Sequence, residues 1–562
     1  MVISNEYIAD QFSLLSKLMD IHGENSFKTK SYSIAAFTIE KLPEQLAEIP
    51  SEKIFAIKGI GDAIGKKIQS IIQTGELKLL SEFIQKTPPG IIEMLRIKGL
   101  GPKKISIIWK EMEIESIGEL LYACQENRLL LFKGFGEKTQ KTIAETIEFY
   151  LKSQGSNLYA DIEAYALELD ALLKKQFPEN RFELTGEFRR QLEIINQLEW
   201  VTNADMQTLK ALFEKMNFTV SVGGGEKMLA EAPGKLSLCF HPSTEAYFPE
   251  ILFETSCSNE FLDAWRKEFS NKDARIFKSE DEIFSNSQVP VIPAYLRDKS
   301  AVIHQARHSG LPKVIQVSDI RAIVHSHSNW SDGSNTVEEM AMGCIKNGFE
   351  WMVISDHSKS AFYANGLNEE RIREQHTYID ELNRKLAPFK IFKSIECDIL
   401  NDGNLDYTNQ ILSTFDLVIT SVHSNLKMTE EKAMLRLLKA IENPYTIILG
   451  HMTGRLLLSR PGYPVDHRKI IDACAANKVV IELNAHPRRL DIDWRWIDYA
   501  LEQGVLISID PDAHSTEGFA DVKYGVLVAQ KAGLTREKNL TSLSLSRMEG
   551  WLNATKKAKG TA

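Results

Sequence analysis

The sequence has few of the features that mark secreted or membrane-embedded proteins. Its six cysteines form no C-x-x-C pair, so we expect reduced thiols that act as small buried hydrophobic residues. No apolar run is long enough to cross a bilayer, and the N-terminus shows no leader of basic, apolar and small residues. We therefore expect a cytoplasmic protein with no membrane partner.

The chain also lacks an excess of basic residues. Its 67 Lys and Arg residues stand against 76 Asp and Glu residues, a net charge of -9. Proteins that bind nucleic acid usually show a basic excess, but a site that holds divalent cations carries positive charge that a residue count omits. The net charge therefore does not decide for or against DNA. With 562 residues, the chain is expected to hold three or four domains of about 150 residues each.

A glycine motif is repeated in the first third of the chain. Residues 57–61 (IKGIG), 97–101 (IKGLG) and 132–136 (FKGFG) share the order apolar, Lys, Gly, apolar, Gly, and an amphipathic helical pattern follows each. Glycine permits positive φ and close backbone approach, so amides at the following helix start can face a phosphate without reading bases. We predict sequence-independent DNA binding by these residues: Gly59, Gly61, Gly99, Gly101, Gly134, Gly136, Lys67, Lys103 and Lys104.

The last part of the chain predicts a metal site at the ends of parallel strands. From about residue 305, seven apolar runs alternate with helical patterns, which is typical of an α/β domain with a parallel sheet. Six of the seven runs end in potential ligands, and the carboxyl ends of parallel strands meet at one mouth. The nine predicted ligands are His325, His327, Asp332, His357, Glu396, His423, His451, Asp512 and His514. Mixed imidazole and carboxylate ligands suit Zn, Mn or Fe.

His325 and His327 are alternate residues at the end of one predicted strand. Because alternate side chains of a strand point the same way, we expect these two histidines to project together. Asp356, beside His357, is predicted to orient a neighbour and not to bind metal. Basic residues on the loops after the strands are candidates to hold a phosphate group: Lys427, Arg455, Arg460, Arg488 and Arg489.

These motifs together resemble the bacterial family X DNA polymerases that carry a C-terminal polymerase and histidinol phosphatase (PHP) domain. The segments that carry the resemblance are GENSFKTKSYSIAAFTIEKLP, TPPGIIEMLRIKGLGPKK, LTGEFRRQLEIINQLEWV and the nine ligand positions. The resemblance implies a multidomain protein. Residues 1–85 would form a helical DNA-binding domain with the first helix-hairpin-helix, 86–152 the second and third hairpins, 158–300 an α+β nucleotidyltransferase-like palm and thumb, and 305–562 an α/β PHP domain, a distorted seven-stranded barrel.

The resemblance also implies three divalent ions in the PHP domain. His325, His327, Glu396 and Asp512 would hold one ion, Glu396, His423 and His451 a second, and Asp332, His357 and His514 the third. Glu396, Asp512 and His514 would be catalytic. In some relatives a lysine of the first hairpin helix attacks abasic-site sugars, and Lys67 lies near the matching position.

The palm segment departs from the family where its chemistry lies. The family's two strand aspartates correspond here to Gln197 and Glu199, and the third aspartate corresponds to Ser237. Glutamine carries no charge and serine is a poor Mg ligand, although nucleotidyl transfer needs two Mg ions held by hard oxygen ligands. We therefore expect polymerase activity to be lost or very weak, and we expect no firm Mg site there.

The combined patterns favour a metal-dependent phosphoesterase that acts on DNA as a 3′ to 5′ exonuclease or 3′-end-processing enzyme in repair. We expect it to be a monomer. Three alternatives stay open: a small-molecule phosphatase of histidinol phosphate type, a DNA-binding scaffold with a structural metal site, and an active repair DNA polymerase.

Overall fold

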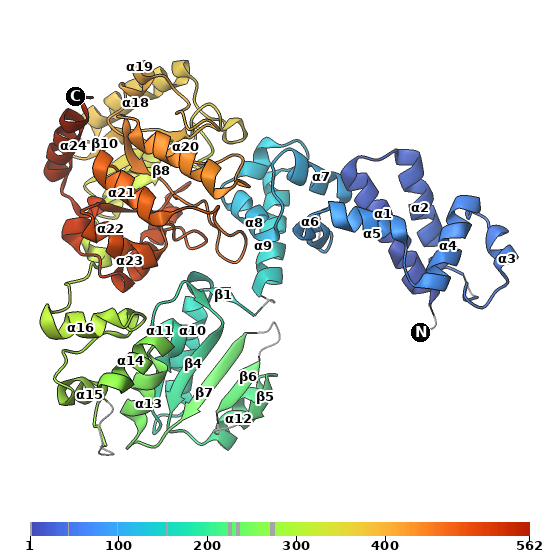
Figure 1. The fold of residues 1–562 in the computed structure, drawn as a ribbon, viewed down its shortest axis with the longest axis horizontal. Helices are drawn as coiled ribbons and strands as arrows, with labels where there is room; N and C mark the ends of the chain where they lie inside the picture. The colour runs from blue at the N-terminus through green and yellow to red at the C-terminus, as the bar shows by residue number, and fades with distance from the viewer. Residues whose placement is uncertain are drawn as a thin grey trace. The chain divides into compact units, whose positions relative to one another are not determined.

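The structure is a computed structural model, and it describes residues 3–42, 44–97, 99–152, 155–222, 227–231, 236–269 and 276–561. The chain divides into two compact units, Met1–Phe149 and Tyr150–Ala562 (Figure 1). Within the described part of the chain, none of the helices combines the length and apolar character that a bilayer crossing requires.

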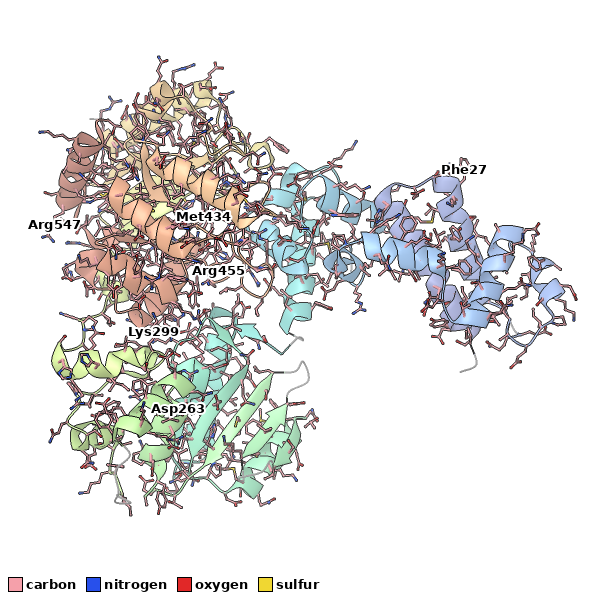
Figure 2. The ribbon with its side chains drawn as sticks, viewed as in Figure 1. Phe27, Asp263, Lys299, Met434, Arg455 and Arg547 are labelled. Atoms are coloured by element: carbon pink, nitrogen blue, oxygen red, sulfur yellow. The ribbon has the colours of Figure 1, made fainter. Side chains whose placement is uncertain are left out.

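The first unit is helical. Its elements are α1 (Asn5–His22), α2 (Ser26–Glu40), α3 (Ser51–Phe55), α4 (Asp62–Thr74), α5 (Lys78–Lys86), α6 (Pro89–Met94), α7 (Pro102–Lys110), α8 (Ile117–Gln125), the 3-10 helix η1 (Arg128–Leu131) and α9 (Glu137–Lys152). The apolar face of α1 is buried, whereas Phe27 on α2 is exposed (Figure 2).

The three glycine motifs form turns between helices, as the sequence predicts. The first glycine of each motif has positive φ, 95° at Gly59, 95° at Gly99 and 100° at Gly134, a conformation that other residues adopt only with strain. The apolar residue between the glycines is buried in each motif, and α4, α7 and α9 begin directly after the second glycine. Lys98 of the second motif lies outside the described residues.

The second unit begins with a mixed sheet of order β2-β4-β7-β6-β5. Its strands are β2 (Phe182–Thr185), β4 (Gln197–Thr202), β5 (Thr219–Val222), β6 (Met228–Glu231) and β7 (Ser237–Pro242). The pair β4 and β7 is parallel, and the other pairs are antiparallel. One face packs on α10 (Tyr159–Gln176) and α12 (Met206–Lys215), and Val201 on the other face packs on α13 (Phe248–Thr255).

The C-terminal half contains the predicted parallel strands with one correction. The strands are β8 (Ala322–Ser326), β9 (Trp351–Ile354), β10 (Lys390–Lys393), β11 (Glu396–Asp398), β12 (Val418–Ser421), β13 (Thr446–Leu449), β14 (Val480–Asn484) and β15 (Ile507–Asp510). The run KIFKSIE, predicted as one strand, is divided into β10 and β11. The division arises because Ser394 still bonds to β9 through the Ile354 carbonyl, whereas the Ile395 carbonyl already bonds to Ile419 of β12.

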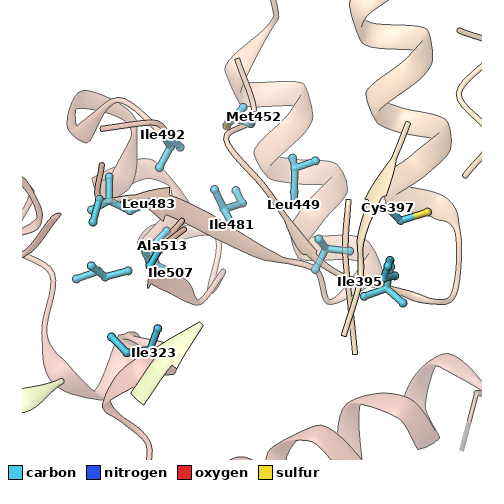
Figure 3. Packing of buried hydrophobic residues seen from close by; sticks show 14 of the residues in the cluster. Ile323, Ile395, Cys397, Leu449, Met452, Ile481, Leu483, Ile492, Ile507 and Ala513 are labelled. Carbon is cyan, nitrogen blue, oxygen red and sulfur yellow. The ribbon is translucent and has the colours of Figure 1, made fainter. Parts of the chain in front are cut away.

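The strands lie in two parallel sheets, β10-β9-β8 and β11-β12-β13-β14-β15. Ala513, which follows β15, pairs in parallel with Ser326 at the end of β8. Strand residues such as Ile323, Ile481 and Ile507 form one buried cluster with residues of the helices that follow the strands (Figure 3). The opposite face is also buried, against α24 (Leu545–Lys559) among others, which explains why the strand runs are apolar throughout.

Other helices of this half follow the strands along the chain, and Figure 1 labels all of them except α17. They are α17 (Val337–Lys346), α18 (Glu369–Lys385), α20 (Glu430–Glu442), α21 (His467–Asn477), α22 (Ile497–Glu502) and α23 (Val522–Lys531).

Polar contacts tie the mixed sheet region to the C-terminal half within the second unit. Nζ of Lys531 is buried, donates to the Arg190 carbonyl oxygen over 2.7 Å and pairs with the Asp298 carboxylate. The Lys523 ammonium pairs with Glu163 over 2.5 Å at a more exposed position. Because a buried ammonium must be compensated, the Lys531 contact fixes this junction more strictly than the Lys523 contact does.

We predict that Lys531→Met lowers the free energy of unfolding of the second unit by about 3 kcal/mol, because it leaves buried acceptors without their cation. Lys523→Met, the matched control at the more exposed pair, should cost less than about 1 kcal/mol. Urea unfolding followed by tryptophan fluorescence measures both. Equal losses in the two variants would contradict the assignment.

Candidate metal centre

The nine predicted ligands converge on the buried carboxylate of Glu396, which is 1% exposed. Five imidazoles approach this carboxylate from the ends of four strands, β8, β9, β12 and β13. Its Oε1 lies 3.0 Å from Nε2 of His423, 3.0 Å from Nε2 of His451 and 3.2 Å from Nε2 of His325, and its Oε2 lies 3.0 Å from Nδ1 of His357 and 3.7 Å from Nε2 of His327. Glu396 is therefore the centre of the cluster.

Two aspartates extend the cluster on either side. Oδ1 of Asp512 lies 3.2 Å from Nε2 of His327 and 3.5 Å from Nε2 of His325. Oδ2 of Asp332 lies 3.5 Å from Nε2 of His357, and its Oδ1 lies 3.5 Å from Nε2 of His514. The structure thus brings together all nine residues that the sequence singles out.

Backbone geometry at two ligands differs from the predicted strand pattern. His325 and His327 were expected to project together as alternate residues of one strand, but β8 ends at Ser326 and His325 has φ of 56°. Asp512 also has positive φ, 54°. Left-handed conformations in residues other than glycine are costly and concentrate at functional sites. The two histidines share one site because the chain turns at His325, and not because of strand alternation.

The charges of the cluster depend on one another. Burial would raise the pKa of Glu396, but the charges of His423, His325 and His357 hold that pKa well below its ordinary value. Burial lowers the pKa of His423, but the charges of Glu396 and Asp398 outweigh it and raise the pKa to about 8. Burial lowers the pKa of His327, and so does the charge of His514. The carboxylates are therefore ionised, while some of the imidazoles are neutral and able to bind a metal.

Several buried atoms of the cluster make no hydrogen bond. They include Nε2 of His325, both ring nitrogens of His327 and of His357, Nδ1 of His451, Oδ2 of Asp332 and Oε2 of Glu396. Buried polar atoms are normally hydrogen-bonded, so these atoms are available to bind a cation. Potential ligand atoms within 4.8 Å of one another occur in overlapping groups that together include all nine residues. The donor set of imidazole and carboxylate fits divalent metal ions.

Sequence reasoning missed the residues that hold these ligands in place. Glu482, fully buried on β14, accepts a hydrogen bond from Nδ1 of His325 and accepts another from the backbone N–H of His451 over 2.5 Å. Oδ1 of Asp398 lies 3.0 Å from Nδ1 of His423. The available signal was an acidic residue inside an otherwise apolar strand run, as in KVVIEL and IECDI.

Asp356 has an orienting role, but not toward His357. Its carboxylate accepts hydrogen bonds from Ser328 N (2.8 Å), Ser331 Oγ (2.5 Å) and Gln375 Nε2 (2.6 Å). These bonds fix the loop that carries Asp332.

The predicted phosphate-binding residues divide by environment. Arg489 is 4% exposed, and its Nε lies 3.7 Å from Oδ2 of Asp512. Nη2 of Arg488 lies 3.9 Å from Oδ2 of Asp161, and the Arg455 guanidinium pairs with Asp493 over 2.6 Å. Nη2 of Arg460 donates to the Gly454 carbonyl oxygen over 2.8 Å, and Lys427 is exposed. The four arginines therefore have protein partners at these loops.

The predicted polymerase positions in the mixed sheet form no carboxylate triad among the described residues. Nε2 of Gln197 donates to Oγ of Ser237 over 2.7 Å, and Oε2 of Glu199 lies 2.7 Å from Nε2 of His241. Arg189, which follows the family's Gly-Ser position, pairs with Glu280 over 2.7 Å.

The predicted DNA-binding residues of the first unit lie on its surface. All six motif glycines are exposed, as is Lys103, and Lys104 is half-buried with its ammonium 3.4 Å from the Gly99 carbonyl oxygen. Lys67 is half-buried as well, and its Nζ lies 3.4 Å from the Ala63 carbonyl oxygen.

We predict that Glu482→Gln weakens divalent-metal binding by roughly tenfold to a hundredfold, because loss of a charged partner to a ligand imidazole has that effect. Competition with a chromogenic chelator gives the affinity. Glu502→Gln, at an exposed position of the same half, is the control and should bind metal as the wild type does. Unchanged affinity in Glu482→Gln would exclude the positioning role.

The chain is similar to known proteins in both of its parts. Residues 3–77 match the helix-hairpin-helix domain family. The DNA polymerase/3′-5′ exonuclease PolX of Bacillus subtilis is 31% identical over 95% of this chain and 96% of its own length. Probable phosphatases of Thermoanaerobacter sp. and Vibrio parahaemolyticus are each 26% identical, over 42% and 40% of this chain and 96% and 90% of their own lengths. The phosphatases match the C-terminal part. The chain therefore belongs to the bacterial PolX family of family X DNA polymerases.

Proposed function

We propose that this protein is a metal-dependent phosphoesterase that removes nucleotides or blocking groups from DNA 3′ ends, and that the reaction takes place at the C-terminal metal centre. The observation that carries the proposal is the convergence of six histidines and two aspartates around the buried carboxylate of Glu396. The relative from Bacillus subtilis is named for a 3′-5′ exonuclease activity, and the C-terminal relatives are named phosphatases. Both activities are phosphoester hydrolysis.

The proposed centre is a PHP-type barrel with three divalent ions, of Zn, Mn or Fe. His325, His327, Glu396 and Asp512 would hold one ion, Glu396, His423 and His451 a second, and Asp332, His357 and His514 the third. Bound ions of this kind lower the pKa of a coordinated water and neutralise phosphoryl oxygens. The strand pairing between Ala513 and Ser326, which links β15 back to β8, supports a closed barrel.

Residues of the chain prepare this chemistry in distinct ways. Glu482 and Asp398 fix the orientations of His325 and His423, and the Asp356 network fixes the loop of Asp332. Arg489, beside Asp512, adds a cation at the edge of the cluster that suits a phosphate oxygen. Glu396, Asp512 and His514 act as catalytic residues through the ions that they hold.

DNA would be held by the three hairpins. At Gly61, Gly101 and Gly136 an added Cβ would meet nothing within 4 Å, so internal packing does not require glycine there. Close approach of a phosphate to the amides that start α4, α7 and α9 gives a reason for these glycines. The contacts would be largely independent of sequence.

Polymerase activity is proposed to be lost or very weak. Gln197 and Ser237 hydrogen-bond to each other, and the one carboxylate, Glu199, is engaged by His241. Two Mg ions have too few hard ligands in such a site. The purified protein should extend a primed template only at background level with Mg or Mn and all four dNTPs. Robust extension would favour the alternative of an active repair polymerase, which the name of the Bacillus subtilis relative also includes.

A small-molecule phosphatase is the second candidate function, because the C-terminal relatives are named phosphatases. The two candidates differ in substrate. Turnover on histidinol phosphate and similar monoesters that exceeds turnover on recessed and single-stranded DNA would favour it.

We predict that the Mn-loaded protein progressively shortens 5′-end-labelled DNA from its 3′ end. Asp512→Asn should reduce the rate more than a hundredfold, since a direct ligand matters more than an outer partner, whose loss costs roughly 10–100-fold. Asp472→Asn, an exposed carboxylate of the same half, is the matched control and should retain full activity. Equal activity of Asp512→Asn and wild type would place the reaction elsewhere, and no activity in any protein would favour the DNA-binding scaffold.

We predict that the double variant Lys103→Ala and Lys104→Ala binds duplex DNA more weakly, and that the slope of log affinity against log salt falls by about two, since each lost phosphate contact removes about 0.9. Fluorescence anisotropy over a salt series measures this slope on unrelated duplexes. Lys346→Ala with Lys385→Ala, two exposed lysines of the second unit, is the control pair. An unchanged slope would remove the second hairpin from the DNA contact.

A further inference from the structure

A second group of potential metal ligands lies in the mixed sheet of the second unit. Glu199 of β4 lies opposite Cys239 of β7 in the parallel register, and His241 follows Cys239 by two residues, on the same face of the sheet. Nε2 of His241 lies 2.7 Å from Oε2 of Glu199 and 3.6 Å from Sγ of Cys239. The three ligand atoms all lie within 4.8 Å of one another.

These separations are close to those that a tetrahedral metal imposes. With metal–ligand lengths of about 2.0–2.3 Å, ligand atoms lie about 3.3–3.6 Å apart. The separation between Cys239 and His241 already has this value, and the separation between His241 and Glu199 needs to widen by about 0.6 Å. Rotation of the Glu199 side chain is enough for such a change, because its side chain is 20% exposed.

The surroundings leave room for this group and shield it. Cys239 is 3% exposed, and the His241 side chain is 6% exposed. Gly186 has φ of 64°, and a Cβ at this position would lie 2.0 Å from Oε1 of Glu199. A residue with a side chain there would displace the carboxylate. Glycine at position 186 therefore leaves the space that the Glu199 carboxylate occupies.

We propose that Glu199, Cys239 and His241 bind one thiophilic divalent cation, Zn²⁺ or Co²⁺, in place of the Mg ions of an active palm. Thiolate and imidazole ligands select such ions, whereas Mg requires oxygen ligands. Gln197 and Ser237 bring no charge, and they hydrogen-bond to each other. The ligands beside Glu199 are therefore the thiol of Cys239 and the imidazole of His241, which are softer than the oxygen ligands that Mg requires. Three protein ligands leave a fourth position for water or an external ligand.

Cobalt substitution tests the site in the full-length protein, independently of the proposed phosphoesterase activity. The nine predicted C-terminal ligands include no sulfur, so a thiolate-to-cobalt charge-transfer band in the near ultraviolet reports a cysteine ligand outside that set, and the variants identify the cysteine. Titration of the wild type with Co²⁺ should produce the band, and Cys239→Ser and His241→Ala should lose it. Each variant should also bind one zinc ion fewer per chain. Cys257→Ser, which removes another buried thiol of the same region, should retain the band.

Two results would overturn the proposal. One is the absence of the band in the wild type at Co²⁺ levels that fill the C-terminal centre. The other is a band that survives in Cys239→Ser. If both variants fail to fold by circular dichroism, zinc-edge X-ray absorption of the wild type decides. A sulfur atom in the zinc shell supports the site, and a shell of nitrogen and oxygen alone excludes it. If the band is present but the protein does not shorten DNA, the proposed metal site stands and only the proposed phosphoesterase activity is rejected.

Discussion

The buried charge of Glu396 is the constraint on which the C-terminal half depends. A carboxylate withdrawn from water is tolerated only when cations or hydrogen-bond donors surround it. Here five imidazoles approach it, yet these imidazoles also approach one another, and the pKa of His327 and of His451 is lowered by burial and by neighbouring positive charge. Protons alone therefore cannot satisfy every member of the cluster. Divalent cations can, because they supply concentrated positive charge to carboxylates and neutral imidazoles together.

The fold supplies this arrangement through parallel strands whose ends meet. Both faces of the strands are buried, so the strand positions are fixed by packing on two sides. Glu482 on β14 and Asp398 on β11 then fix individual imidazoles from within the same strands. His325 and Asp512 adopt a left-handed backbone conformation, which is strained in residues other than glycine. This conformation directs both side chains to the same site, and the tight packing around the two residues stabilises it.

The sequence predicted which residues cluster, and where the hairpin turns lie, better than it predicted their geometry. Polar residues after successive apolar runs were enough to single out all nine residues that the structure brings together, and positive φ was foreseeable where glycine recurs, as at Gly59. The break between β10 and β11 was not foreseeable, because it depends on which neighbouring strand each carbonyl meets. The role of Glu482 was missed for a similar reason: its partner His325 is 157 positions away along the chain.

The two sheet regions of the second unit differ in the chemistry that they retain. The mixed sheet has one carboxylate at the predicted polymerase positions, whereas the C-terminal strands bring together all nine predicted ligand residues. The central claim is that these nine residues hold metal. Anomalous scattering from crystals of the Mn-loaded protein tests it most directly. We predict three peaks around Glu396, each within bonding distance of its imidazole and carboxylate groups. Density with no anomalous peak there, and with the imidazoles still paired directly to the carboxylates, would contradict it.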